Sequence, residues 1–272
     1  MLSKYLQIPL VAGALISLYL AWEEGSRYAI YMVPFVVGMA VVYVLSPQID
    51  WWWYQHRPPE LPAPLRHLIN TRFPFYQNLS ADEKTRFRNR MALYMHANEF
   101  MPQGMESVPM DVKGVIAASV VQLTFGLEDY RLSKFEYIIV YPHPFPSPQF
   151  PEKWHVSEIF EEDGVIMVSA EQLMASFLQP ERYFNIGLYE YARVYRRCYP
   201  GVSFPVLGEN SWEQLQAISG YSKDVIEKWI GLPKPDVLAV AIAHFFVFPK
   251  KFKALLPEAY EELAGVFKQR PY

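Results

Sequence analysis

One short segment places a carboxylate between a tyrosine and two arginines. Glu190 directly follows Tyr189, and Arg193 and Arg197 come three and seven residues after it. Residues at these spacings share one face of an α-helix, so both guanidinium groups can approach the carboxylate. We therefore expect an ion pair that neutralises Glu190. A solvated helix face with no special role is the alternative interpretation.

The histidines and the single cysteine show no spacing typical of a metal site or a catalytic group. Cys198 has no assigned histidine partner, and such a thiol is more often packed than nucleophilic. The histidines are scattered along the chain: His56, His67, His96, His143, His155 and His244. His143 stands between two prolines, which predicts an irregular loop around it.

Several segments, taken in order, resemble the Mlc titration factor A (MtfA) family of zinc-dependent peptidases. Asn185–Arg193 is similar to the family's helix Asn-x-x-Leu-His-Glu-Phe-Ala-His, and the expected strand Gly164–Ser169 precedes it as in that family. Further similar segments follow the family's order: Ser80–Glu83, Ile116–Ala118, Ile139–Pro142, His244–Pro249 and Tyr260–Leu263. The resemblance covers roughly residues 75–270 and implies a zincin-like fold.

The resemblance also points to the positions where the family holds its metal. Two histidines four residues apart bind zinc there, and the glutamate between them acts as the general base. Here Tyr189 and Arg193 occupy the histidine positions, and only Glu190 remains. Tyrosine is a poor zinc ligand at neutral pH because its pKa is about 10, and arginine is a permanent cation. The family's further acidic ligand aligns with Ala243, or with His244 after a shift of one residue.

We therefore expect a degenerate site that contains no zinc and no intact set of catalytic residues. Glu190 occupies the position of the general base, but without a metal it has no water to activate. The resemblance places His143 in a loop beside the substrate cleft. The candidate cleft residues are accordingly Glu190, Arg193, Arg197, His143 and His244.

Two uncharged apolar stretches predict a transmembrane hairpin at the N-terminus. Tyr5–Trp22 and Tyr28–Leu45 are each near the lower limit of length for crossing about 30 Å of hydrocarbon. A short turn, Glu23–Arg27, separates them, and Trp51–Tyr54 follows where aromatic side chains favour the membrane interface. We expect residues 5–45 to contact membrane lipid. A buried hairpin of a soluble protein is the alternative.

The distribution of lysine and arginine predicts the orientation of the hairpin. The turn carries Arg27 with two glutamates, whereas Lys4, Arg57, Arg66 and Arg72 flank the two spans on the other side. The positive-inside rule then places both termini in the cytoplasm. The expected protein crosses the inner (cytoplasmic) membrane twice, with its soluble domain in the cytoplasm.

The rest of the pattern predicts an α+β fold with three parts. Residues 1–50 form the hairpin, residues 51–74 an aromatic belt and a proline-rich linker, and residues 75–272 the MtfA-like domain. Ser80 and Glu83 have the spacing of a capping box. Asp163-Gly164 predicts a turn between two strands. Helices are expected on both sides of a few antiparallel strands, one of them starting near Arg182 and including Glu190.

The composition argues against nucleic-acid binding, and the sequence as a whole leaves three hypotheses for the function. The net charge of −3 and the pI of about 6.1 argue against a nucleic-acid-binding surface. We favour a membrane-anchored, catalytically inactive relative of the MtfA peptidases that binds a protein or peptide in its cleft. The alternatives are an active zinc peptidase with atypical ligands, such as Glu190 and His244, and a structural subunit of a membrane complex.

Overall fold

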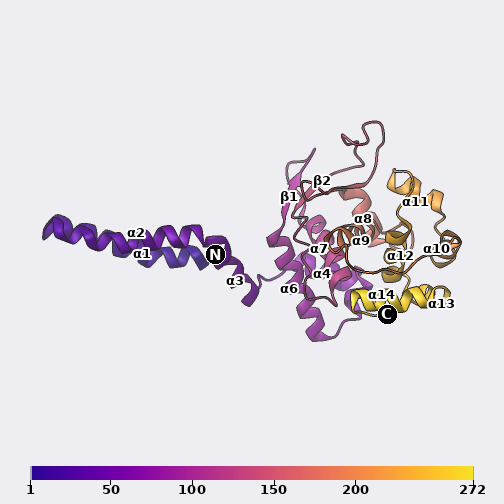
Figure 1. Cartoon of the computed structure of the whole chain (residues 1–272), viewed down its shortest axis with the longest axis horizontal. Helices are drawn as coiled ribbons and strands as arrows, with labels where there is room; N and C mark the ends of the chain where they lie inside the picture. The colour runs from indigo at the N-terminus through magenta and orange to yellow at the C-terminus, as the bar shows by residue number, and fades with distance from the viewer. Residues whose placement is uncertain (1, 272) are drawn as a thin grey trace. The chain divides into compact units, whose positions relative to one another are not determined.

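A computed structural model describes residues 2–271, and the chain divides into two compact units, Met1–Pro59 and Glu60–Tyr272 (Figure 1). The first unit contains the apolar helices and the second contains all the strands. The α+β class and the presence of two apolar N-terminal helices are therefore as predicted.

The N-terminal unit is a helical hairpin. α1 (Leu2–Glu23) and the span Ser26–Val44 are long and apolar enough to cross a membrane. The second span begins as a 3-10 helix, η1 (Ser26–Tyr31), and continues as α2 (Met32–Val44), which runs alongside α1 (Figure 1). Most of their large apolar side chains are exposed, as lipid contact requires.

A short helix, α3 (Ser46–His56), completes this unit and carries the tryptophan cluster. Asp50 in α3 ties the two ends of the hairpin together, because its carboxylate accepts hydrogen bonds from the Ser3 main-chain N–H at 2.9 Å and from the Ser3 hydroxyl at 2.7 Å.

The second unit begins earlier than the sequence suggested. Much of the expected linker is helical: α4 (Ala63–Arg72) starts after Pro62, contains Pro64 in its first turn and packs against α7 (Met110–Thr124). Leu65 and Ile69 on α4 are buried, because their spacing of four residues directs both side chains to one face. Residues 63–72 thus belong to the core of the second unit rather than to a free spacer.

The sheet of the second unit has four strands in the order β1-β2-β4-β3. β1 (Glu99–Pro102), β2 (Tyr137–Tyr141) and β4 (Val165–Ser169) are parallel, whereas β3 (Ser157–Phe160) pairs antiparallel with β4. The expectation of purely antiparallel strands was wrong. The Asp163-Gly164 turn joins the antiparallel pair, and α7 lies in the connection between the parallel strands β1 and β2.

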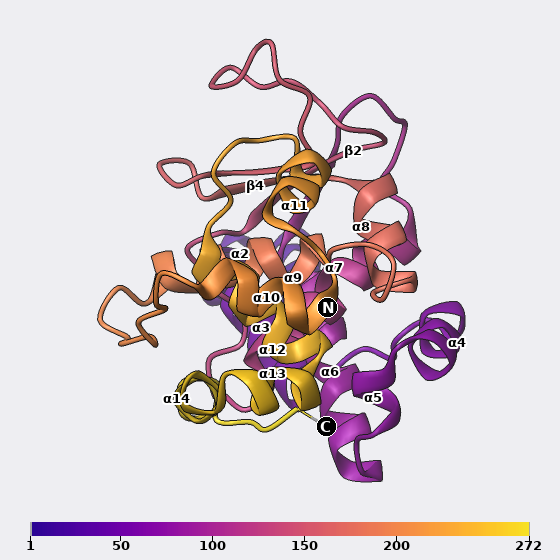
Figure 2. The ribbon, with the colours of Figure 1, turned by 90° about the vertical axis from the view of Figure 1, so that its right-hand side faces the viewer.

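In the core, α9 (Ile186–Cys198) packs against α7 and against α12 (Val237–Val247). The strands β2 and β4 lie above these helices in Figure 2. Gly187 permits the close approach of α9 to α7, because a Cβ at this position would lie 2.3 Å from Ser119 Oγ. The remaining helices are α5 (Pro74–Gln77), α6 (Ala81–Ala97), α8 (Ala170–Leu178), α10 (Ser211–Ser219), α11 (Lys223–Ile230), α13 (Pro249–Leu255) and α14 (Pro257–Phe267).

The ends of the helices follow the local sequence signals. The predicted capping box at α6 is confirmed: the Ser80 main-chain N–H donates to Glu83 Oε2 at 2.9 Å, and the Glu83 N–H donates to Ser80 Oγ. The helix expected from Arg182 starts later, at Ile186. Asn185 caps it by accepting a hydrogen bond from the Leu188 N–H at 2.9 Å, and this fixes its first turn.

Candidate functional site

Glu190 is buried on α9 and bonded on both carboxylate oxygens. Its Oε1 accepts a hydrogen bond from the hydroxyl of Ser157 on β3 at 2.7 Å. One terminal nitrogen of Arg193 donates to both oxygens, at 2.8 and 3.1 Å. The glutamate is only 2% exposed, so a nearby cation is needed to offset the loss of hydration. The structure therefore places Arg193 beside Glu190, as the spacing predicts.

Arg193 remains charged in spite of its partial burial. Desolvation alone would lower the pKa of its guanidinium, but Glu190 and Tyr189 beside it outweigh this and raise the pKa above its usual value. The guanidinium also lies 5.5 Å from the centre of the Tyr189 ring, within the range of a cation–π contact. This charge cannot be displaced from Glu190 without cost.

Tyr189 is packed as a neutral phenol. Its side chain is buried, and its hydroxyl oxygen accepts a hydrogen bond from the Asp236 main-chain N–H at 3.2 Å. Burial is the main cause that raises the pKa of Tyr189 to about 12. The phenolate that a metal would require is therefore strongly disfavoured.

The side chains on α9 do not fit a zinc ion as they are arranged. Zinc sites use deprotonated thiol, neutral imidazole and carboxylate ligands, whereas this helix offers a protonated phenol, a guanidinium and a carboxylate already bonded to that guanidinium. Across residues 2–271, no three His, Cys, Asp or Glu side chains are grouped so that they could hold a metal ion.

Of the other candidates, Arg197 is bonded to Arg193 and lines the same cavity. Its side chain donates to the Arg193 main-chain oxygen at 3.1 Å and lies 3.4 Å from a carboxylate oxygen of Glu161. His143 forms an exposed pair with Glu171 at 2.8 Å, and neither residue lines a cavity with Glu190.

The two candidates on α12 are buried in the core. Ala243 is 1% exposed and offers no ligand atom. His244 Nδ1 bonds the Val240 main-chain oxygen at 2.9 Å, and its ring lies among Phe184, Tyr221 and Phe248. Burial lowers the pKa of His244 to about 4, so this imidazole is neutral at physiological pH.

A cavity of about 310 Å³ lies beside this site. α9 contributes Tyr189, Arg193 and Arg197, and β3 contributes Glu158 and Ile159. The loop before α12 closes another side with residues 232–236. Because β3 is at the edge of the sheet, the cavity lies between a strand edge and the helix that carries Glu190.

A glycine holds the loop of this cavity against the strand region. Gly231 has a φ of 82°, and a Cβ there would lie 2.2 Å from the Trp154 main-chain oxygen. The neighbouring Ile230 main-chain oxygen accepts a hydrogen bond from the Val156 N–H at 3.0 Å. The loop is thus fixed to the segment that leads into β3.

Four residues that the sequence analysis did not single out shape the site: Ser157, Glu158, Lys234 and Asp236. The available signal was a charged residue in an expected strand, because Glu158 directly precedes the apolar residues Ile159 and Phe160. A buried carboxylate in a strand is rare unless it has a partner. Lys234 and Asp236 carry no comparable signal.

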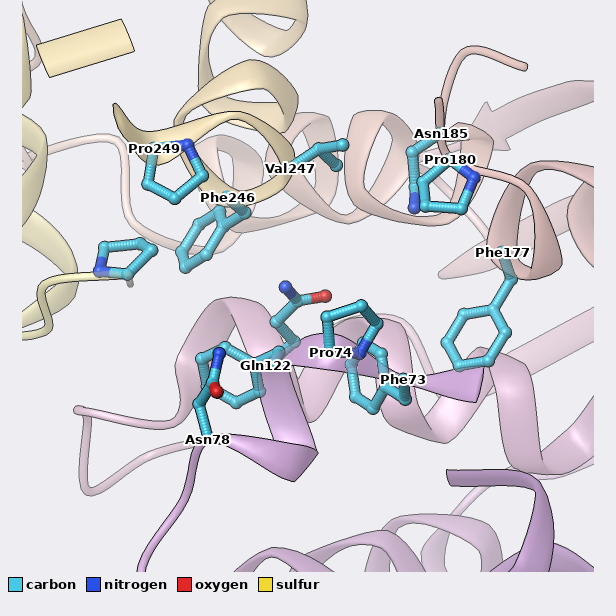
Figure 3. Close-up of a pocket in the computed structure, with 12 residues that line it drawn as sticks. Phe73, Pro74, Asn78, Gln122, Phe177, Pro180, Asn185, Phe246, Val247 and Pro249 are labelled. Carbon is cyan, nitrogen blue, oxygen red and sulfur yellow. The ribbon is translucent and has the colours of Figure 1, made fainter. Parts of the chain in front are cut away.

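A second cavity, of about 90 Å³, is lined mainly by phenylalanine and proline side chains (Figure 3). Gln122 projects into it from α7, and Asn185 borders it at the start of α9 (Figure 3). None of the described residues that line it is titratable. This cavity shares no residue with the one beside Glu190 and offers no group for acid–base chemistry.

Comparison with known proteins identifies the family. The sequence profile described as "Glucose-regulated metallo-peptidase M90" matches residues 50–194, just over half of the chain. The matched region ends directly after Arg193, so it includes the part of α9 that carries Tyr189, Glu190 and Arg193 but not α12. No curated protein sequence matches the chain significantly. By its sequence profile, this chain belongs to the glucose-regulated metallo-peptidase M90 family.

Proposed function

We propose that this protein is a membrane-anchored, catalytically inactive member of its peptidase family, which binds a protein or peptide in the cavity beside α9 without cleaving it. The observation that carries this proposal is the contact of Arg193 with both carboxylate oxygens of Glu190. A general base must accept a proton from a bound water. Here the carboxylate is bonded to a permanent cation and a hydroxyl instead.

The absence of bound zinc is part of the same proposal. Tyr189 and Arg193 supply no ligand, and His244 contributes a neutral ring enclosed by aromatic side chains. A peptidase that used Glu190 and His244 as ligands would have to break the Arg193 pair and repack α12. This cost weighs against the atypical-ligand alternative.

Metal content tests the proposal. We expect the full chain, purified in a mild detergent and dialysed against trace zinc, to contain far less than one zinc per molecule by elemental mass spectrometry. The Glu190→Ala variant should give the same low value. Near-stoichiometric zinc that disappears in Glu190→Ala would overturn the proposal and restore a peptidase with unusual ligands.

For location, we propose a two-pass protein of the inner membrane with both termini in the cytoplasm. The support is the distribution of lysine and arginine around the two spans. The turn contains one arginine, Arg27, with Glu23 and Glu24, whereas the segments at the other ends of the spans carry more basic residues. The apolar side chains exposed along α1 and α2 are consistent with lipid contact.

Cysteine labelling tests the orientation. In a Cys198→Ser background, we expect a membrane-impermeant maleimide to label Ser26→Cys in intact spheroplasts, because the turn should face outward. Val206→Cys, at a position 98% exposed in the second unit, should react only after lysis. The opposite pattern would invert the proposed orientation.

A further inference from the structure

The cavity beside α9 has an anchored cation on one wall. Arg193 uses one terminal nitrogen for Glu190, and its remaining N–H groups make no hydrogen bond within residues 2–271. The side chain is 21% exposed and lines the cavity. A guanidinium held in place from behind by a buried carboxylate loses little freedom on binding an anion.

A second cation lines the same cavity. Lys234 is exposed and forms no ion pair with any described residue. It lies between Pro233 and Pro235 with a φ of 56°, a conformation that is unfavourable for a non-glycine residue. The loop therefore holds this lysine at the cavity in an unfavourable backbone conformation.

A buried acceptor on a residue of the cavity wall has no hydrogen-bond partner within the described part of the chain. Glu158 lines it and is only 3% exposed, yet its Oε1 has no hydrogen-bond partner among the described residues. Its Oε2 lies 3.0 Å from His155 Nε2, and His155 Nδ1 lies 2.8 Å from the Lys153 main-chain oxygen. A buried oxygen without a partner is unfavourable, so a ligand that donates a hydrogen bond to it is favoured.

The His155–Glu158 contact also determines what Oε1 can do. Both imidazole nitrogens lie within hydrogen-bonding distance of an oxygen atom, so the ring is held on two sides. This contact engages Oε2 and leaves Oε1 without a partner among residues 2–271. The cavity therefore presents the free acceptor atom of Glu158 together with the cations Arg193, Arg197 and Lys234. Of the two other charged groups in its lining, Arg197 contacts Glu161 and Asp236 pairs with Arg196.

We propose that this cavity binds the C-terminal residue of a peptide. Its carboxylate would meet Arg193 and Lys234, and its main-chain N–H would donate to Glu158 Oε1. An apolar terminal side chain would contact Phe150, Ile159 and Leu232, which also line the cavity. The proposal rests on the proposed function, since it names what the zinc-free cleft recognises.

The size and charge of the cavity favour this ligand over a simple anion. At about 310 Å³ it lies at the lower end of the range for small-ligand sites. Inorganic phosphate carries no apolar part to cover the Phe150 and Leu232 walls. A C-terminal residue supplies an anion, an N–H donor and an apolar side chain in one unit.

Calorimetric titration of the full chain in detergent tests this inference. The probe is N-acetyl-alanyl-leucine, compared with its C-terminal amide, with free leucine and with inorganic phosphate. We expect the acid to bind at least about tenfold more tightly than each of the other three, because a lost charge-assisted hydrogen bond is worth about a factor of ten. The Lys234→Gln and Glu158→Gln variants should each weaken the binding of N-acetyl-alanyl-leucine by a similar factor.

The matched control is Lys251→Gln, which removes an exposed lysine outside the cavity and should leave binding unchanged. Lys234 is exposed, so its variant should fold even if Glu158→Gln does not. Equal binding of acid and amide, tighter binding of phosphate or free leucine, or no binding of any probe would overturn the inference. Stoichiometric zinc with cleavage of the probe would instead overturn the proposed function.

Discussion

The Glu190→Ala variant is expected to lose about 3–5 kcal/mol of unfolding free energy. Removing the carboxylate leaves the partly buried Arg193 guanidinium without its counter-charge and the Ser157 hydroxyl without its acceptor. Urea unfolding of the full chain in detergent, followed by tryptophan fluorescence, measures the change.

Removing both charges together should be less harmful than removing one. In a Glu190→Leu, Arg193→Met double variant no charge is left unpaired, so its loss of stability should be clearly smaller than that of Glu190→Ala. Glu161→Ala is the exposed control, because the contacts of Glu161 with Lys134 and Arg197 are screened by water. A Glu190→Ala variant as stable as the parent chain would contradict the buried ion pair.

The second large effect concerns His244 and pH. The pKa of His244 is about 4 in the folded protein and about 6.5 in the unfolded chain, because burial opposes the charged ring. Between these values the unfolded chain binds the extra proton. The contribution of His244 to the unfolding free energy is therefore complete above pH 6.5. It is lost as the pH falls toward 4, by about 3 kcal/mol in total.

Replacement of this histidine isolates its contribution. The His244→Phe variant carries no titratable group at a site already surrounded by Phe184, Tyr221 and Phe248. We expect its unfolding free energy to fall less steeply than that of the parent chain between pH 6.5 and 4, whatever its stability at neutral pH. Parallel curves for the two proteins over this range would show that His244 is not buried as a neutral ring.

Signals within one segment were sufficient to predict much of the fold. The Ser80 and Glu83 spacing marks the start of α6, and Asp163-Gly164 marks the turn between β3 and β4. These features depend on residues close in sequence, whose conformations are set by local hydrogen bonds. The Glu190–Arg193 pair was predictable for the same reason, since three residues on a helix bring two side chains together.

Features that depend on distant residues were not predictable in this way. The four residues of β1 carry no alternating pattern, and the strand exists because Glu99–Pro102 pairs with Tyr137–Val140. α4 was taken for part of a linker because the prolines before it dominate the local pattern, while its burial depends on α7. Glu158 and Lys234 meet at one cavity only through the tertiary fold.

The Glu190–Arg193 pair also restricts how this sequence can change. A histidine at position 193 alone would leave Glu190 buried without a cation, and a histidine at position 189 alone would face a guanidinium instead of a metal. Each single step toward a zinc-binding helix therefore passes through a less stable protein. For a lineage that starts from this chain, the ion pair would stabilise the fold and would oppose the formation of a zinc-binding helix by one substitution at a time.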